Sequence, residues 1–286
     1  MGHRTSVERE MPAGRSSIDS NAQEKSSSPG SWLAAMRAAV LTLALFFCFL
    51  RFGLIWLNAI RRGRHVAPIE RARWMQVSGR LVLAAMGIRY RVEGPVPSGA
   101  TLIVANHLSY LDIVIASAAA PCAFVAKQEI ATWPAFGTLA RLGGNIFLNR
   151  MSRASAWEVA DRMAARLANG VPVLLFPEGT STDGSEVTRF HSTLFAPAVE
   201  ARLPVTPAAI FYQPSRSETG IEERDICWFG DASFLPHLLR VLGITGFTAI
   251  VRFGVPEVFP DRQTAAWRTH DAVAQLRSQE RAPSLP

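Results

Sequence analysis

The segment Thr101-Leu102-Ile103-Val104-Ala105-Asn106-His107-Leu108-Ser109-Tyr110-Leu111-Asp112 is the part of the chain that best predicts its fold. It opens on a run of almost entirely aliphatic residues, which is typical of a strand buried on both faces of a sheet. Polar residues follow this strand directly, and α/β folds build their functional sites at the carboxyl ends of such strands. The segment therefore predicts an α/β protein with a site at His107.

His107 and Asp112 have the chemistry of a general base and its orienting partner. A carboxylate that accepts a hydrogen bond from one ring nitrogen of a histidine fixes the tautomer of the ring. The other ring nitrogen is then free to take a proton from a hydroxyl group. A second interpretation is open at this point: Asn106 caps a helix, and His107 and Asp112 are ordinary polar residues in its first turns.

A second apolar strand ends in a similar way. Val171-Pro172-Val173-Leu174-Leu175 leads into Phe176-Pro177-Glu178-Gly179-Thr180-Ser181-Thr182. The simpler interpretation is a turn in which Pro177 and Gly179 interrupt the chain. Two strand ends of this kind favour a shared site, because α/β folds place their functional residues at this edge of the sheet.

With these two motifs the chain resembles the glycerophospholipid acyltransferases of the lysophosphatidate acyltransferase type. That family is marked by a histidine-x4-aspartate motif, here His107 and Asp112, and by a Phe-Pro-Glu-Gly-Thr motif, here residues 176–180. Two weaker blocks match in the family's order, Gly144-Asn145-Ile146-Phe147-Leu148-Asn149-Arg150 and Leu203-Pro204-Val205-Thr206-Pro207-Ala208-Ala209-Ile210. The resemblance spans roughly residues 90–210.

The resemblance implies a membrane-bound enzyme that moves a fatty acyl group from a thioester to the free hydroxyl of a lysophospholipid. The reaction expected from the family converts 1-acyl-glycerol-3-phosphate to phosphatidate, with acyl-CoA or acyl carrier protein as donor and with no metal or cofactor. No enzyme nucleophile is required, because the acceptor supplies its own oxygen. The implied site residues are His107 and Asp112 for catalysis, and Arg150, Glu178, Gly179 and Thr180 for substrate binding.

Two departures from the family leave the identity of the acceptor open. Many members carry arginine where this chain has Ser181, and lysine where it has His191. Both changes remove positive charge that could meet an acceptor phosphate, although Arg150 and Arg189 can compensate. A lyso-ornithine lipid is therefore the alternative acceptor, and the Thr182-Asp183-Gly184 run resembles that branch of the family.

Other nucleophilic side chains give weaker signals. Ser109 could serve a lipid hydrolase, which is a further alternative, but no glycine-x-serine-x-glycine turn surrounds it. Cys48, Cys122 and Cys227 have neither metal-ligand spacing nor a pairing pattern. We therefore expect three buried or membrane-facing thiols in a reducing compartment.

The composition favours a lipid partner over nucleic acid. Hydrophobic residues make up 49% of the 286 residues, and the formal net charge is +7. The mean hydropathy is +0.14, which is high for a soluble enzyme. Basic and acidic residues cancel within residues 1–31, so the excess positive charge belongs to the remainder, where it can face anionic lipid. The chain has no zinc-finger spacing and no basic run interleaved with aromatic residues, so a nucleic-acid partner is not expected.

The N-terminal part of the chain differs from the rest in composition. Residues 1–31 are polar and rich in serine and glycine, so we expect a disordered tail. The family resemblance implies a pair of membrane-associated helices over residues 32–87. The acyltransferase catalytic domain would then occupy residues 88–286.

The apolar stretch 38–60 predicts the first of these helices. It would be roughly 34 Å long, close to the thickness of the bilayer core, but Arg51 lies near its middle. The helix could therefore span the membrane or lie partly in one leaflet. The basic group Arg61, Arg62 and Arg64 follows it and favours a catalytic domain on the cytoplasmic side of the inner membrane. Pro68 and Gly87 predict the limits of a second helix over 69–86.

Beyond residue 88, apolar strand-like segments alternate with helical ones. Strands are predicted over 89–93, 101–105, 122–127, 146–149, 172–176, 205–211, 225–230 and 248–254. Helices are predicted near 111–119, 133–142, 153–168, 192–201 and 262–277. This alternation predicts a mostly parallel mixed sheet flanked by helices.

Overall fold

A computed structural model describes residues 31–149, 153–215 and 220–279 of the chain. Its α-helices are α1 (Ser31–Arg61), α2 (Pro68–Met86), α3 (Leu111–Ala119), α4 (Phe136–Leu142), α5 (Arg153–Ala168), α6 (Ala196–Glu200), α7 (Glu223–Ile226), α8 (Phe234–Gly243) and α9 (Arg262–Ser278). Its strands are β1 (Arg89–Glu93), β2 (Leu102–Ala105), β3 (Ala123–Lys127), β4 (Ile146–Leu148), β5 (Val173–Leu175), β6 (Val205–Pro214) and β7 (Phe247–Phe253). Two short 3₁₀ segments are η1 (Gln128–Thr132) and η2 (Ser192–Phe195). The predicted tail over 1–31 lies outside the described residues apart from Ser31.

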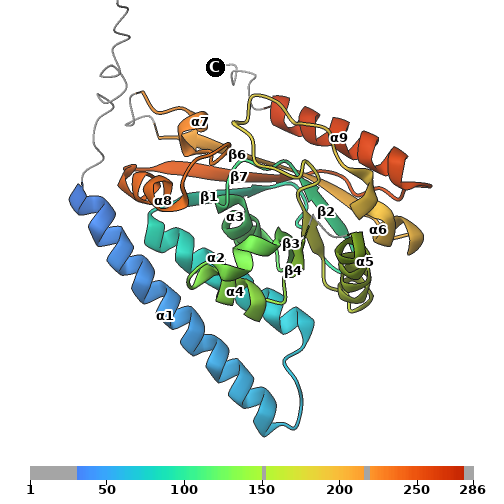
Figure 1. Cartoon of the computed structure of the whole chain (residues 1–286), viewed down its shortest axis with the longest axis horizontal. Coiled ribbons are helices and arrows are strands. Elements are labelled where there is room, and N and C mark those ends of the chain that lie inside the picture. Colours follow the sequence, from blue (N-terminus) through green and yellow to red (C-terminus); the bar gives the residue numbers. More distant parts are fainter. Residues whose placement is uncertain (1–30, 150–152, 216–219, 280–286) are drawn as a thin grey trace, which may run out of the picture.

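The strands form one sheet in the order β1-β7-β6-β2-β5-β3-β4 (Figure 1). Neighbouring strands are parallel except β6 and β7, which run antiparallel. β2 lies at the centre, with Ala105 opposite Ala208 of β6 and Leu102 opposite Val173 of β5. The sheet is therefore mixed and mostly parallel, as predicted, and the carboxyl ends of β2, β3 and β5 meet at one edge.

Helices cover both faces of the sheet (Figure 1). Ile103 and Ala105 of β2 pack in a core that includes residues of α2, α3 and α8. Leu102 and Val104 point to the opposite face, into a core that includes residues of α5 and α9. None of these four side chains is exposed to solvent, so β2 is buried on both faces, as its aliphatic run predicted.

α1 and α2 form a helical hairpin beside the sheet (Figure 1). Trp74 of α2 packs edge-on against Phe52 of α1, with ring centroids 4.9 Å apart, and its indole N–H donates to the Cys48 carbonyl (3.0 Å). α2 also approaches α3 closely at Gly79, where a β-carbon would lie 2.9 Å from the Val114 carbonyl oxygen. The predicted helix pair is thus present and packs against the helix that follows β2.

Within the described part of the chain, α1 is the one helix long and apolar enough to cross a membrane. It begins at Ser31, earlier than the predicted residue 38, and continues through Arg51, which is exposed. Its exposed large apolar side chains are Trp32, Met36, Val40, Leu43, Phe46, Phe47, Leu50, Leu54, Trp56, Leu57 and Ile60. Apolar surface of this extent is typical of a helix that contacts lipid or another protein.

Some elements differ from the predictions. The prediction of a strand over 225–230 is wrong, because α7 occupies the first of these residues. The Trp228 N–H donates to the Leu108 carbonyl (2.9 Å), which lies outside the sheet. The Asp225 carboxylate accepts from the Glu222 N–H (2.9 Å), which favours the start of a helix there. α8 was not predicted. Its Pro236 lies in the first turn, where a helix tolerates proline, so the proline does not exclude a helix here.

Candidate active site

The chain leaves the sheet at the carboxyl end of β2. Asn106 is buried there, and its side-chain amide donates to the Ile210 carbonyl (2.9 Å) and accepts from the Ile210 N–H (2.8 Å). These two bonds replace the next rung of the ladder between β2 and β6, so the backbone can turn away at His107 without leaving Ile210 unpaired. Asn106 therefore holds the end of a strand, and its interpretation as a helix cap is wrong.

Asp112 lies in the first turn of α3 and faces back toward His107. His107 Nδ1–H donates to Asp112 Oδ2 (2.8 Å), and the same oxygen accepts from the backbone N–H groups of Leu108 (2.6 Å) and Ser109 (3.0 Å). The other oxygen, Oδ1, accepts from the Tyr212 hydroxyl. The carboxylate is fully buried, and these donors together with the amino end of α3 stabilise its charge.

The His107 ring is also held by an aromatic contact. It stacks on Phe176, with ring centroids 4.3 Å apart and an angle of 14° between the planes. The side chain keeps 17% of its surface exposed, so a substrate can reach it. Since Nδ1 is bonded to Asp112, Nε2 is the ring nitrogen left to exchange a proton with a substrate.

Glu178, from the second strand end, holds the turn that carries His107. Its Oε1 accepts from the His107 N–H (2.7 Å), and its Oε2 accepts from the Thr188 N–H (2.9 Å) and hydroxyl (2.7 Å). The residue is 5% exposed, and burial raises the pKa of its carboxyl against the opposing effect of these bonds. Both oxygens are thus engaged within the protein, which favours a positioning role. The direct acceptor contact expected from the motif stays a prediction.

The other predicted binding residues lie on the same turn or outside the described chain. Gly179 has a φ of 79°, a backbone conformation that favours glycine, and the Thr180 that follows it is exposed. The Thr182 N–H donates to the His107 carbonyl (2.9 Å), so this turn lies directly against the histidine. Arg150 lies outside the described residues, and its contact with substrate stays a prediction.

His107 lies at the wall of a cavity of about 400 Å³. The aromatic side chains around it are Tyr110, Trp133, Phe176 and Trp228, and the polar ones besides His107 are Lys127, Glu129 and Ser181. A space of this size, with apolar walls and a few polar groups, is typical of a site for a small molecule or part of a lipid.

A second cavity, of about 60 Å³, shares part of its wall with the first, including Tyr110, Ile113 and Trp133. It lies among α2, α3, α4 and α8, and Phe234 and Leu238 of α8 close one side of it. Its lining is almost wholly apolar. The two cavities together therefore lead from the histidine into an apolar space between the helices.

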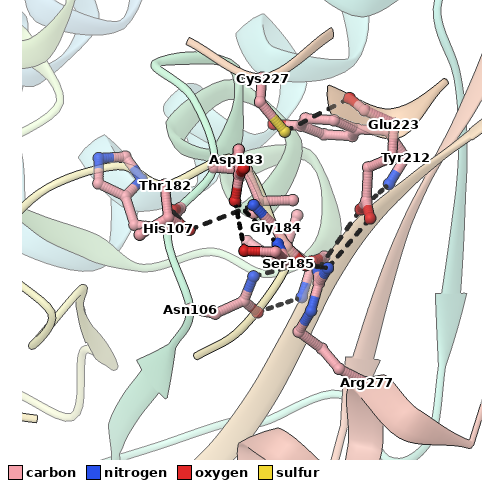
Figure 2. Close-up of polar contacts among 12 residues, drawn as sticks. Asn106, His107, Thr182, Asp183, Gly184, Ser185, Tyr212, Glu223, Cys227 and Arg277 are labelled. Atoms are coloured by element: carbon pink, nitrogen blue, oxygen red, sulfur yellow. Dashed lines mark hydrogen bonds and ion pairs between the residues drawn. The ribbon is translucent and has the colours of Figure 1, made fainter. Parts of the chain in front are cut away.

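A buried polar network behind His107 and Asp112 was not predicted from the sequence (Figure 2). Arg277 of α9 pairs with Glu223 of α7 (3.0 Å) and donates to the Gly184 carbonyl (2.8 Å) and the Ile210 carbonyl (2.5 Å). Glu223 in turn accepts from the Tyr212 N–H (3.0 Å). Neither Arg277 nor Glu223 belongs to a motif, and the two lie 54 positions apart in the chain, so no local pattern could have revealed their pairing.

Ser109 does not have the geometry of a nucleophile. It is fully buried, and its hydroxyl oxygen accepts from the Leu111 N–H (3.3 Å) at the start of α3. The three cysteines are free and buried, as expected, and burial raises the pKa of the Cys122 and Cys227 thiols. The hydrolase alternative therefore finds no support in the structure.

Comparisons with known proteins bear on what such a site does. Residues 87–211 match the model of the Acyltransferase family. A lyso-ornithine lipid O-acyltransferase from Pseudomonas aeruginosa is 36% identical to this chain over 191 residues, which are 65% of this chain and 71% of that protein. The chain belongs to this acyltransferase family.

The acyltransferase is also similar to members with another acceptor. A 1-acyl-sn-glycerol-3-phosphate acyltransferase from Neisseria meningitidis is 37% identical over 155 residues, 54% of this chain and 60% of that protein. The enzyme is thus an acyltransferase of the lysophospholipid type, and lysolipids are the acceptors to test. A crystal structure of a 1-acyl-sn-glycerophosphate acyltransferase from Thermotoga maritima has a TM-score of 0.61 at 20% identity and covers 88% of this chain and 100% of its own. That likeness confirms the predicted fold class.

Proposed function

We propose that this acyltransferase moves a fatty acyl group from a thioester to the hydroxyl of a lysolipid, with His107 as the general base. The observation that carries the proposal is the 2.8 Å hydrogen bond from His107 Nδ1 to the buried Asp112, at the wall of the larger cavity. An acceptor hydroxyl in that cavity loses its proton to Nε2 while its oxygen attacks the thioester carbonyl carbon. Asp112 stabilises the imidazolium that forms.

The second half of the reaction returns that proton. As the tetrahedral intermediate collapses, the new C–O bond is kept, the C–S bond breaks, and Nε2 gives its proton to the leaving thiolate. Ser181 lines the cavity beside His107, so its hydroxyl and backbone N–H are candidates for stabilising the oxyanion. His107 ends each cycle neutral, and no acyl group is left on the protein.

The apolar cavity among the helices, of about 60 Å³, offers a place for a short part of a fatty chain. It adjoins the larger cavity at Tyr110 and Trp133, so a chain inserted there leaves its carbonyl group near His107. Transfer of methylene groups from water into such a space is favourable by about 0.8 kcal/mol for each group. This arrangement would bring two poorly miscible substrates together at one catalytic group.

For the acceptor we favour a lyso-ornithine lipid. Its head group carries one ammonium and one carboxylate, so recognition needs protein charges of both signs. Lys127 and Glu129 line the larger cavity together with His107 and provide such a pair. A phosphate monoester instead favours clustered cations, and Ser181 stands where many members of the family carry arginine. The Pseudomonas relative, which matches more of this chain than the Neisseria relative, supports the same choice.

Lysophosphatidate is the second candidate acceptor. The Neisseria relative, at 37% identity, is named for that reaction. Arg150 and Arg189 would then supply the positive charge for the phosphate, and Gly179 and Thr180 would let the acceptor approach the backbone of the turn. Conversion of 1-acyl-glycerol-3-phosphate to phosphatidate would be the result.

We infer that α1 attaches the enzyme to the cytoplasmic face of the inner membrane. Its exposed apolar side chains fit the acyl region of a lipid layer, and Arg61, Arg62 and Arg64 at its carboxyl end fit anionic head groups. Arg51 is exposed midway along α1 and favours a helix that lies within one leaflet. The division into an attached part over 32–87 and a catalytic part over 88–286 belongs to this proposal.

The test is a panel of donors and acceptors with purified protein in detergent. Acyl-CoA and acyl carrier protein are each paired with lyso-ornithine lipid and with lysophosphatidate, and thiol release and diacyl product are measured. We expect transfer to lyso-ornithine lipid to be the faster reaction. A folded protein that transfers acyl groups to none of these acceptors from either donor would refute the proposal.

The base assignment is tested in the same assay. His107→Ala should lower the rate by about 10²- to 10⁴-fold, since it removes the group that accepts the proton, and thermal unfolding checks that the variant is folded. His191→Ala is the matched control, because that histidine is exposed and should leave the rate unchanged. Retained turnover in the His107 variant would show that another group is the base.

A further inference from the structure

We propose that Tyr212 is a positioning residue of this site, whose hydroxyl holds the Asp112 carboxylate in the orientation that receives His107. The inference rests on the proposed function, because a residue that orients the pair matters to the rate only if His107 is the base. No motif marks Tyr212, and its assignment comes from its contacts alone.

The strand geometry aims Tyr212 at the catalytic pair. Along β6, Ala208, Ile210 and Tyr212 point to the sheet face that packs against α3, while Ala209 and Phe211 point to the other face. Tyr212 is 3% exposed. Its hydroxyl donates to Oδ1 of the carboxylate at the start of α3.

The two oxygens of Asp112 therefore have separate sets of donors. Oδ2 accepts from His107 Nδ1 and from the backbone of Leu108 and Ser109, whereas Oδ1 accepts from Tyr212. Rotation of the carboxylate would break bonds on both oxygens at once. Without the tyrosine hydroxyl, Oδ1 would be a buried charged oxygen that has lost its donor.

Tyr212 is itself fixed from several sides. Its ring packs edge-on against Phe247, with centroids 5.8 Å apart, and its N–H donates to Glu223 (3.0 Å). The pair of Glu223 and Arg277 connects this point to the Gly184 carbonyl, on the loop beside His107 (Figure 2). Figure 2 also shows the His107 ring pointing away from this network, so Tyr212 acts through Asp112 and does not touch the reacting atoms.

Burial and the ionisable groups around the Tyr212 hydroxyl keep it protonated, so it remains a hydrogen-bond donor. Asp112 faces it from α3, Glu223 from α7 and Cys227 from the segment after α7, with Arg277 of α9 beside Glu223. Burial, and then the negative charge of Asp112, raise the pKa of Tyr212 well above its ordinary value. The hydroxyl therefore stays protonated over the whole range in which the enzyme can be assayed.

Replacement of Tyr212 by phenylalanine removes the hydroxyl and keeps the ring. The Asp112 carboxylate then loses a hydrogen bond that partly offsets its negative charge, so it attracts the His107 imidazolium more strongly. It also gains freedom to rotate. We expect Tyr212→Phe to lower kcat on the order of 10- to 100-fold, the usual effect of losing a hydrogen bond to a charged group. KM for the lysolipid should stay unchanged, and the acidic limb of the pH profile of kcat should move to higher pH.

Tyr90→Phe is the matched control, since Tyr90 lies on β1, away from the site, and should show neither effect. A wild-type rate and pH profile in Tyr212→Phe would overturn the inference. A lower rate with an unmoved acidic limb would also overturn it, because a merely structural role predicts that result.

A double-mutant cycle provides the second measurement. In an Asp112→Asn background, Tyr212→Phe should have little further effect, because the group that it positions is already altered. Equal losses in both backgrounds would contradict a role through Asp112, as would a Tyr212→Phe protein that is recovered only unfolded. An inactive wild type would instead count against the proposed function, so the two failures can be told apart.

Discussion

Asp112 shows at the residue scale how this site is built. An ionised carboxylate is costly to bury unless hydrogen bonds replace its water. Asp112 has no exposed surface, and its donors are the backbone of Leu108 and Ser109, the ring of His107 and the hydroxyl of Tyr212. Each donor also fixes the carboxylate in space, so the bonds that stabilise the charge orient the histidine as well.

Glu178 allows a sharp test at the same scale. A glutamine there keeps one acceptor oxygen but must point an amide N–H₂ at either the His107 N–H or the groups of Thr188. A buried donor left without a partner costs about 1–3 kcal/mol. We therefore expect Glu178→Gln to lower kcat and to lower the thermal midpoint by roughly 2 to 12 °C.

Glu186→Gln is the control for this prediction, since Glu186 is exposed on the same loop. Kinetics with varied lysolipid, together with thermal unfolding in detergent, separate the two roles of Glu178. Direct contact with the acceptor would raise KM and leave the thermal midpoint unchanged. That result would favour the binding role expected from the motif over the positioning role.

At the scale of elements, the placement of α3 decides where Asp112 lies. α3 packs between the sheet and α2, and the approach of α2 depends on Gly79. A β-carbon at this position would lie 2.9 Å from both the Ser117 Oγ and the Val114 carbonyl oxygen. Since the carbonyl belongs to the α3 backbone, it can give way only if one of the helices moves.

Gly79→Ala should therefore destabilise the protein and also reduce its activity. Overpacking of this kind costs typically about 1–3 kcal/mol, and the shift of α3 would displace Asp112 from His107. Gly53→Ala on α1 is the matched control, because a β-carbon there meets nothing within 4 Å. Thermal midpoints and kcat of the two variants check the prediction, and equal behaviour of the pair would contradict it.

At the scale of the whole molecule, His237 of α8 makes the stability of the fold depend on pH. The ring is 8% exposed, with Nδ1 accepting from the Tyr110 hydroxyl (3.1 Å) and Nε2–H donating to the Cys227 carbonyl (3.0 Å). Burial, and then the positive charge of Arg240, lower the pKa of His237 from 6.5 to about 4. Between pH 6.5 and about 4, the ring of His237 is thus neutral in the folded protein and protonated in the unfolded chain.

The sign of the effect follows from this difference. The stabilisation from neutral His237 is complete above pH 6.5 and is lost as the pH falls toward about 4, by roughly 3 kcal/mol in total. Thermal midpoints measured between pH 7 and pH 4 should fall more steeply for the wild type than for His237→Gln. His65→Gln, at an exposed position, should keep the wild-type slope. Parallel curves of thermal midpoint against pH for the wild type and the His237 variant would contradict the prediction.

Elements with a strong local pattern were predicted with little error. The spans Arg89–Glu93, Leu111–Ala119 and Arg153–Ala168 agree with the prediction at both ends. Strand-like residues 225–230 misled the prediction, because the Trp228 backbone bonds to the loop after β2 and not to a strand. An apolar run shows that a segment is buried, but it does not show which partner accepts its hydrogen bonds.

The apolar runs were enough to predict a mostly parallel mixed sheet with a strand buried on both faces, and the spacing of His107 and Asp112 was enough to predict that their side chains pair. Periodicity and helical spacing are local properties of a chain. Tyr212 and Asp112 are 100 positions apart, and Arg277 and Glu223 are 54 apart. Their contacts depend on the register of β6 against β2 and on where α7 and α9 dock. Folding alone brings these side chains together, since their partners are set by packing over long distances in the chain and leave no pattern in the residues around them.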